Sequence, residues 1–511
     1  MPRHPSVDPP PSAFGPLPSL ASLPSDSIQG GVAPWATQDP STGFAEQRDV
    51  SDTPLRQGCP PLVFGGGVFG EGMYNDDEFT KTEMPARIVR LAFRYGINAI
   101  DTSPYYYPSE FILGRCLSLL AEEHPRSTYY LCTKAGRYGP NLCDFDYSPQ
   151  KIRSSVEASL RRLNTDYLDL VYLHDSEFVA EQVGEGQQAG MAAKLASQDD
   201  PEGQEARRSL GLAPGDESKI HGPGDETILA AVATLFALKD EGKIRSVGIS
   251  GYPLPALLRI SRLVASRAPY RALDAILSYS NHTLHSDLLP AYVRLFNQPP
   301  TIVCNGKGQT EKSMMNGEWT PPLVLNGSPF SMGLLTDAGP PSWHPASAEL
   351  KQACKDAAEE LHLQKDGDDE STLAITALTY GIRGAELAAR NRQGPALRTL
   401  LGMSTPEQVH SAVDAYRVLL AGVFSVHQNG NGHSINGSVL KDSSRVNGSA
   451  ANGHAKEAPT PFVELDQQAK KDQERLRRRY QQQVRNEEIV LQKIDSVGKR
   501  GWSWASPGED A

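Results

Sequence analysis

Four polar side chains with different acid–base properties lie at or just beyond the ends of short apolar segments. Asp101 ends the segment INAID, Lys134 ends TYYLCTK, and His174 follows DYLDLVYL. Tyr106 lies five residues after Asp101, in the turn PYYYP. Together these groups suit proton transfer at an oxygen atom, because an alcohol being oxidised needs a base there and a carbonyl being reduced needs an acid.

The phenol is the group whose chemistry depends most on its neighbours. A tyrosine with its ordinary pKa near 10 is a weak base at neutral pH. An adjacent Lys134 ammonium favours the phenolate and is expected to lower the pKa of Tyr106. Asp101 would keep the lysine charged and oriented, and His174 would orient a substrate oxygen or assist proton relay. Each residue alone has a structural explanation, but the four together predict a site.

These side chains must be positioned by a regular alternation of strands and helices. Segments of helical periodicity follow a series of short, almost continuously apolar runs. Such an alternation indicates a parallel sheet covered on both faces. We expect eight strands, at residues 61–64, 97–101, 128–136, 166–175, 244–250, 273–280, 322–330 and 396–404.

Eight strand–helix units predict an α/β fold, a closed (β/α)₈ TIM barrel, with an open doubly wound sheet as the alternative. The helices are expected at residues 84–96, 109–123, 148–164, 225–243, 253–265, 284–296, 347–363, 370–383 and 405–422. Neighbouring parallel strands lie about 4.8 Å apart. Asp101 and Lys134 should therefore be neighbours at one end of the barrel, with His174 one strand further on.

Two other motifs are typical of different enzymes, but their context argues against them. Gly65-x-Gly67-x-x-Gly70 matches a dinucleotide-binding pattern, yet a loop follows where that pattern requires a helix. A glycine-rich barrel loop that approaches a ligand is the favoured interpretation, which makes Gly66 and Gly67 candidate cofactor contacts. Tyr130 and Lys134 match a tyrosine–lysine pair that needs one helix face, but along a strand they lie about 13 Å apart.

Outside the barrel, predicted for residues 59–424, the composition becomes polar. Residues 1–58 are expected to form a disordered tail, and residues 425–464 a linker. Residues 465–511 form a charged, potentially helical tail that is expected to be solvated, although its arginines could contact an acidic partner. Two polar insertions interrupt the barrel, at about 176–222 and 297–319. The first could act as a lid, or could be a disordered surface loop.

Composition excludes several classes of partner. The net charge of −11 argues against nucleic-acid binding. The six cysteines lack metal-ligand spacing, which indicates reduced core residues of a cytoplasmic protein without a metal site. No apolar run reaches the roughly 18 residues of a membrane span. The N-terminus has neither a secretory pattern nor an arginine-rich presequence.

The tetrad Asp101, Tyr106, Lys134 and His174, with its contexts IDTSPYY, TKAG and LHD, resembles that of the aldo-keto reductase superfamily. The resemblance covers about residues 60–424. PSEFILG, LHDSEFV, VGISGYPL, LSYSNHTL and SPFSMGLLTDAGPPSWHPAS are similar to the branch of L-galactose dehydrogenase and fungal D-arabinose dehydrogenase. This resemblance implies oxidation of an aldose at C1 to the aldono-lactone, with a nicotinamide dinucleotide bound without a Rossmann fold. In fungi the reaction serves synthesis of an ascorbate-like compound, erythroascorbate.

The resemblance also implies three groups of cofactor contacts. They follow the sixth, seventh and eighth strands and would meet the nicotinamide, the pyrophosphate and the adenosine in that order. The first group is Ser278, Tyr279 and Asn281; the second is Ser328, Pro329, Met332, Gly333 and Leu334; the third is Gly402, Met403, Ser404 and Gln408.

The cofactor and the substrate are predicted from departures within these groups. NADP-specific relatives place a cation near Ser404, but here the stretch STPE supplies none and adds an acid, so NAD is expected, with NADP as the alternative. Tyr107-Pro108 replaces the glycine usual after the catalytic tyrosine, which would reshape the pocket mouth. A small sugar is the expected substrate. The alternative functions are an NADPH-dependent aldehyde or ketone reductase and a non-catalytic nucleotide-binding regulatory subunit.

Overall fold

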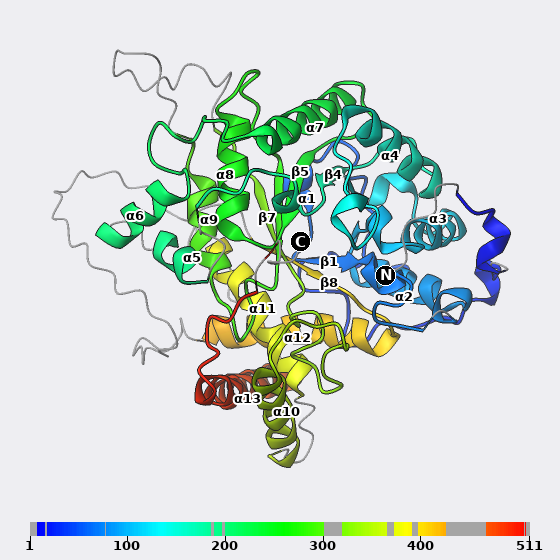
Figure 1. The fold of residues 1–511 in the computed structure, drawn as a ribbon. Helices are drawn as coiled ribbons and strands as arrows, with labels where there is room; N and C mark the ends of the chain where they lie inside the picture. Colours follow the sequence, from blue (N-terminus) through cyan, green and yellow to red (C-terminus); the bar gives the residue numbers. More distant parts are fainter. Residues whose placement is uncertain are drawn as a thin grey trace, which may run out of the picture.

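The computed structural model describes residues 8–15, 18–76, 78–184, 189–196, 200–300, 319–364, 372–390, 397–425, 467–504 and 506. Eight parallel strands close into a barrel in sequence order, with β8 beside β1 (Figure 1). This confirms the predicted TIM barrel and excludes the open sheet. The strands are β1 Leu62–Gly65, β2 Ala99–Asp101, β3 Tyr130–Ala135, β4 Leu170–Leu173, β5 Val247–Gly251, β6 Ala275–Tyr279, β7 Leu323–Gly327 and β8 Arg398–Leu401.

Helices surround the barrel and follow each strand. Ser148 caps the N-terminus of α4, where its Oγ accepts a hydrogen bond from Lys151 N at 3.4 Å. Gly96 ends α2 with a left-handed φ of 92°, as its position after the apolar pattern predicts. The barrel helices are α2 Met84–Tyr95, α3 Ser109–Leu119, α4 Pro149–Arg162, α7 Pro223–Asp240, α8 Leu254–Ala265, α9 Leu289–Asn297, α10 Ala348–Leu363, α11 Leu373–Arg390 and α12 Pro406–Ser425.

The barrel interior explains how the tetrad is positioned. Val63, Ala99, Cys132, Tyr172 and Leu277 belong to one buried cluster contributed by several strands. Successive side chains of a strand point to opposite faces, so the inward rows continue every second residue. Asp101 therefore continues the row of Ala99, Lys134 that of Cys132 and His174 that of Tyr172. The same pattern that fills the core delivers three polar side chains to the carboxyl end.

The described part of the N-terminal segment, residues 8–15 and 18–58, packs on the barrel, which corrects the prediction of a disordered tail for these residues. Phe14, Leu23, Ala33 and Ala45 are buried in its described part, which also contains α1 Leu55–Gly58. Polar contacts add to this packing: Arg87 donates two hydrogen bonds to Asp26, at 3.0 and 2.8 Å. The apolar residues have no helical or strand period, so a search for periodicity misses them.

The first insertion contains two helices, α5 Ala189–Ala196 and α6 Pro201–Ser209. It packs outside the barrel, where Tyr292 Oη donates to the carbonyl of Ala192 at 2.9 Å. The buried Glu217 forms an ion pair with Arg262 at 3.4 Å. Most of residues 176–222 is thus ordered, and the disordered-loop prediction is corrected. Of the second insertion, residues 301–318 lie outside the described residues.

The charged tail also differs from its prediction. Helix α13, Gln467–Ser496, packs against α10, α11 and α12 rather than standing in solvent (Figure 1). Its buried face carries Glu487, Val490 and Ile494, and Glu487 is paired with Arg383 of α11. Three of the five buried residues of α13, Gln483, Asn486 and Glu487, are polar, which is why hydrophobic periodicity does not reveal this face. Residues 426–466, most of the predicted linker, lie outside the described part.

Truncating Ile494 tests the packing of α13. Its side chain is fully buried, so Ile494→Ala is expected to reduce the free energy of unfolding by about 2–5 kcal/mol. Glu488, on the exposed face of the same helix, is the control, and Glu488→Ala should stay within about 0.5 kcal/mol of the wild type. Urea unfolding of the two variants checks the result. If both variants changed the free energy of unfolding equally little, α13 would not be packed against the barrel.

Candidate active site

Lys134 is at the centre of the candidate site. Its ammonium donates to the Asp101 carboxylate on the neighbouring strand and to the carbonyl of Thr102 at 3.0 Å. Lys134 and Asp101 are only 1% and 2% exposed. The Tyr106 ring lies on the other side of the ammonium, with its centroid 4.7 Å from Nζ. The lysine therefore connects the carboxylate to the phenol, as their positions in the sequence predict.

His174 completes the predicted tetrad. Its Nδ1 lies 2.9 Å from Ser103 Oγ, and its backbone carbonyl accepts a hydrogen bond from Tyr147 Oη at 2.7 Å. The imidazole meets the Tyr106 ring edge to face, with the ring centroids 5.6 Å apart. Because Ser103 occupies Nδ1, the Nε2 atom is the one available to a substrate oxygen.

Burial controls the protonation of these groups. It lowers the pKa of His174 well below the usual range, and the charges of Lys134 and Arg137 act in the same direction, so the imidazole is neutral at neutral pH. Burial acts most strongly, to lower the pKa of Lys134, but the charges of Asp101 and Tyr106 together with hydrogen bonds to both outweigh it and the net pKa is raised. For Tyr106, burial raises the pKa more than Lys134 lowers it. The sequence predicts that Lys134 lowers the pKa of Tyr106, but the net pKa of this phenol is raised.

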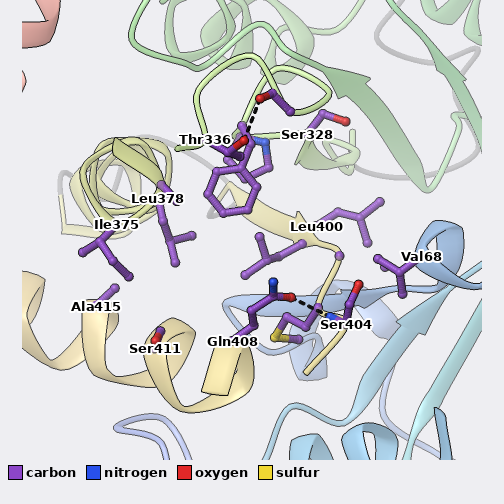
Figure 2. Close-up of a pocket in the computed structure, with 18 of the residues that line it drawn as sticks. Val68, Ser328, Thr336, Ile375, Leu378, Leu400, Ser404, Gln408, Ser411 and Ala415 are labelled. Atoms are coloured by element: carbon purple, nitrogen blue, oxygen red, sulfur yellow. Dashed lines mark hydrogen bonds between the residues drawn. The ribbon is translucent and has the colours of Figure 1, made fainter. Parts of the chain in front are cut away.

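A cavity of about 2380 Å³ opens above the tetrad, and all four side chains line it. It continues past β7 and β8 toward α11 and α12. Figure 2 shows Ser328 on one side of this cavity and Ser404, Gln408 and Ser411 on the other. The volume and the position at the carboxyl ends of the strands fit an elongated ligand whose reacting end lies at the tetrad.

Several known proteins are similar to this chain in sequence. The sequence model of the Aldo/keto reductase family matches residues 61–286. The D-arabinose 1-dehydrogenase of Saccharomyces cerevisiae is 33% identical over 360 residues, which cover 70% of this chain and 83% of that protein. The chain belongs to the aldo/keto reductase family. The L-galactose dehydrogenase of Arabidopsis thaliana is also 33% identical over 360 residues, 70% of this chain and 82% of that protein.

A shorter match links this aldo/keto reductase to an enzyme of Escherichia coli named NADH-specific methylglyoxal reductase. The two are 38% identical over 132 residues, which cover 23% of this chain and 37% of that protein. As a member of the family, the chain is an oxidoreductase that uses a nicotinamide cofactor, NAD(P)(H), and acts on a small molecule. Among its described helices, none has the length and apolar character needed to cross a bilayer.

The cavity of this aldo/keto reductase can be compared with the cofactor contacts that the resemblance implies. In the loop after β7, φ is 50° at Ser328, 48° at Ser331, 51° at Met332 and 93° at Gly333. Left-handed residues turn successive backbone N–H groups toward one side, which suits the oxygens of a pyrophosphate. The predicted contacts that line the cavity are Gly67, Tyr279, Ser328, Pro329, Met332, Gly333, Gly402, Met403, Ser404 and Gln408.

Four predicted cofactor contacts, Gly66, Ser278, Asn281 and Leu334, do not line the cavity. Gly66 has no room for a side chain, because a Cβ there would come within 3.0 Å of the Asp101 carbonyl oxygen. Asn281 Nδ2 donates to Ser278 Oγ at 2.9 Å and to the Tyr252 carbonyl at 2.6 Å, so both side chains support the backbone of other loops. Leu334 is fully buried in an apolar cluster. These residues shape the loops from behind.

The structure adds three residues beside the tetrad that the sequence analysis did not single out as functional. Arg137 forms an ion pair with Asp175 and donates to Tyr105 Oη at 3.1 Å. All three line the cavity. Arg137 lies three residues after Lys134, and Asp175 follows His174 directly. The sequence did carry a signal for Arg137 and Asp175, because polar residues continue beyond the ends of these two strands.

At the predicted adenosine end, Ser404 N donates to Gln408 Oε1 at 2.6 Å (Figure 2). Asn75 Nδ2 donates to Ser404 Oγ at 3.0 Å. Four arginine side chains of α13 also line this cavity, Arg475, Arg478, Arg479 and Arg485, and Arg479 is paired with Asp414 at 2.6 Å. None of the described residues of the first insertion beyond Asp175 lines the cavity, which argues against a lid there.

Proposed function

We propose that this aldo/keto reductase is an NAD-dependent aldose 1-dehydrogenase that oxidises D-arabinose or L-galactose at C1 to the aldono-lactone. The observation that carries the proposal is the Lys134 ammonium, held between the Asp101 carboxylate and the Tyr106 ring on the cavity surface. Similarity to two aldose dehydrogenases over 70% of the chain supports the substrate class.

Each tetrad residue then has a role that its geometry allows. Tyr106 takes the proton of the C1 hydroxyl, and the Lys134 charge stabilises the resulting phenolate against the effect of burial. Asp101 holds the lysine in place. The neutral His174 forms a hydrogen bond through Nε2 with the sugar oxygen. A bound nicotinamide supplies the acceptor for the hydride that leaves C1.

The raised pKa of Tyr106 predicts the pH dependence of the reaction. Below that pKa, the ionised fraction of the phenol grows about tenfold for each pH unit. Oxidation, which needs the base, should therefore accelerate as the pH rises from about 7 to 9, whereas reduction, which needs the acid, should change little. Initial rates in the two directions measure this. A flat oxidation profile would assign the base to another group.

The substrate class is tested by NADH formation from purified full-length protein with D-arabinose, L-galactose, L-fucose and D-glucose in parallel. We expect turnover with D-arabinose or L-galactose. If no aldose is oxidised but methylglyoxal is reduced with NADPH, the chain is the alternative aldehyde reductase. If neither reaction occurs although a nucleotide binds, the regulatory-subunit alternative is supported instead.

Coenzyme choice is proposed as NAD because residues 402–408 contain no cation and include Glu407. A 2′-phosphate near Ser404 would lack a partner and face repulsion. Arg475 of α13 is one of several arginines that could reverse this preference, since it lines the same cavity. Titration with both coenzymes decides: an advantage of NADP of about tenfold, 1.4 kcal/mol, would overturn the choice, and its disappearance in Arg475→Ala would assign the 2′-phosphate contact to that residue.

A further inference from the structure

The end of the described chain returns to the active-site end of the barrel. After α13, residues 502–504 and 506, here the C-terminal segment, lie beside the strand ends (Figure 1). The Trp504 ring stacks on Tyr252, which directly follows β5, with centroids 3.8 Å apart and planes 16° apart. Ser503 Oγ lies 2.7 Å from Tyr252 Oη. The segment is therefore attached to the catalytic face through both stacking and hydrogen bonding.

On the substrate side, this contact reaches the cavity wall. Tyr252 packs against Tyr279, with ring centroids 5.4 Å apart, and Tyr279 lines the cavity together with the tetrad. Ser506 Oγ donates to Glu177 Oε1 at 3.0 Å, and the same oxygen accepts from Tyr252 N at 2.9 Å. Trp504 and Ser506 thus fix the ends of three strands, β4, β5 and β6, around the place where a sugar would lie.

On the cofactor side, Trp502 contacts two buried histidines. Its ring lies 5.5 Å from that of His285 and 6.2 Å from that of His344. His285 Nε2 lies 2.7 Å from Ser331 Oγ, and His344 Nε2 lies 2.9 Å from the Ser331 carbonyl oxygen. Ser331 belongs to the loop after β7, whose backbone amides are the candidate pyrophosphate contacts.

That loop has a conformation that requires support. Ser331 and Met332 are consecutive non-glycine residues with left-handed φ of 48° and 51°. Such residues are unfavourable alone and persist only where their surroundings hold them. The two histidines hold Ser331 from its side chain and its carbonyl, and Trp502 packs against both. Trp502 therefore acts on the cofactor loop through these rings.

We propose that the C-terminal segment is a positioning element for both ligands, with Trp504 placing Tyr279, where the nicotinamide would meet the aldose, and Trp502 placing the Ser331 loop for the pyrophosphate. The identity of these two ligands rests on the proposed function. Anchoring α13 is a separate role that Glu487, Val490 and Ile494 already fill. The aromatic residues beyond the helix contact the cavity-forming loops, and Trp502 also packs against the apolar cluster that contains Val490 and Ile494.

The test uses full-length Trp504→Ala and Trp502→Ala, with Trp504→Phe and Trp502→Phe as conservative variants. Trp502→Ala should raise KM for NAD about tenfold and change KM for the aldose less than about twofold, whereas Trp504→Ala, whose ring contacts Tyr279, His344 and Trp502, should raise both constants about tenfold. The phenylalanine variants should recover most of each loss. Arg500→Ala, which removes an exposed pair with Asp495, is the control and should change neither constant.

A purely structural role would not divide the two constants in this way. The proposal is overturned if Trp502→Ala raises both KM values together, or if neither alanine variant changes either value. If the wild type oxidises no aldose, the proposed function fails, and the inference is tested separately by titrating NADH and following its fluorescence. A dissociation constant for NADH that is the same in Trp502→Ala and in the wild type would then overturn it.

Discussion

Tyr106→Phe is expected to lower kcat for aldose oxidation by about 10²–10⁴-fold, the range found when a general acid–base group is removed. The ring is retained, so its contact with the Lys134 ammonium and its edge-to-face packing on His174 remain. Only the proton-accepting oxygen is lost. KM for the aldose and the affinity for NAD should therefore change little.

Steady-state kinetics of the variant beside Tyr107→Phe provide the measurement. Tyr107 is adjacent in sequence and packs on Phe111, with ring centroids 6.0 Å apart, outside the set of residues that line the cavity. Tyr107 is half-buried and does not line the cavity, so the expected reshaping of the pocket mouth by this side chain is not found, and its phenylalanine variant should keep activity within about twofold of the wild type. If both variants retain activity, Tyr106 is not the acid–base residue.

Lys134→Met should damage stability as well as activity. Asp101 is 2% exposed and would keep a buried carboxylate without its cation, an arrangement that typically costs about 3–5 kcal/mol. Activity should fall too, because the phenolate of Tyr106 would lose the charge that favours it. Urea unfolding and steady-state rates measure the two effects on one preparation.

The double variant Asp101→Asn/Lys134→Met separates these effects. Without either charge, the buried site should regain much of the lost stability, as happens when a buried ion pair is replaced by neutral groups. Activity should stay low because the ammonium is still absent. A double variant that is stable and fully active would show that the pair serves the fold and not the chemistry.

The barrel and the tetrad were accessible from the sequence for one physical reason. A strand buried on both faces is an almost continuous apolar run, so a polar residue at its end is conspicuous. Asp101, Lys134 and His174 were found in this way, and the spacing of Tyr106 from Asp101 completed the set. The protonation of Tyr106 was not predictable, because the effect of burial on its pKa depends on packing that no local pattern records.

The appended segments were less accessible. The N-terminal segment is held by scattered residues without period, such as Phe14 and Ala33, and by hydrogen bonds such as that of Trp35 Nε1 to the Gly96 carbonyl at 2.9 Å. Three of the five buried residues of α13 are polar. The contact of Trp504 with Tyr252 joins residues 252 positions apart, and such tertiary pairs have no signature in one sequence.

The central claim is that hydride leaves C1 of an aldose while Tyr106 removes the hydroxyl proton. It is tested most directly by incubating the wild-type protein with NAD and D-arabinose or L-galactose carrying deuterium at C1, and analysing the NADH by mass spectrometry. The account predicts deuterium in the nicotinamide ring of the NADH, and loss of this transfer in Tyr106→Phe. NADH that forms without the label, or labelled NADH formed equally fast by Tyr106→Phe, would contradict it.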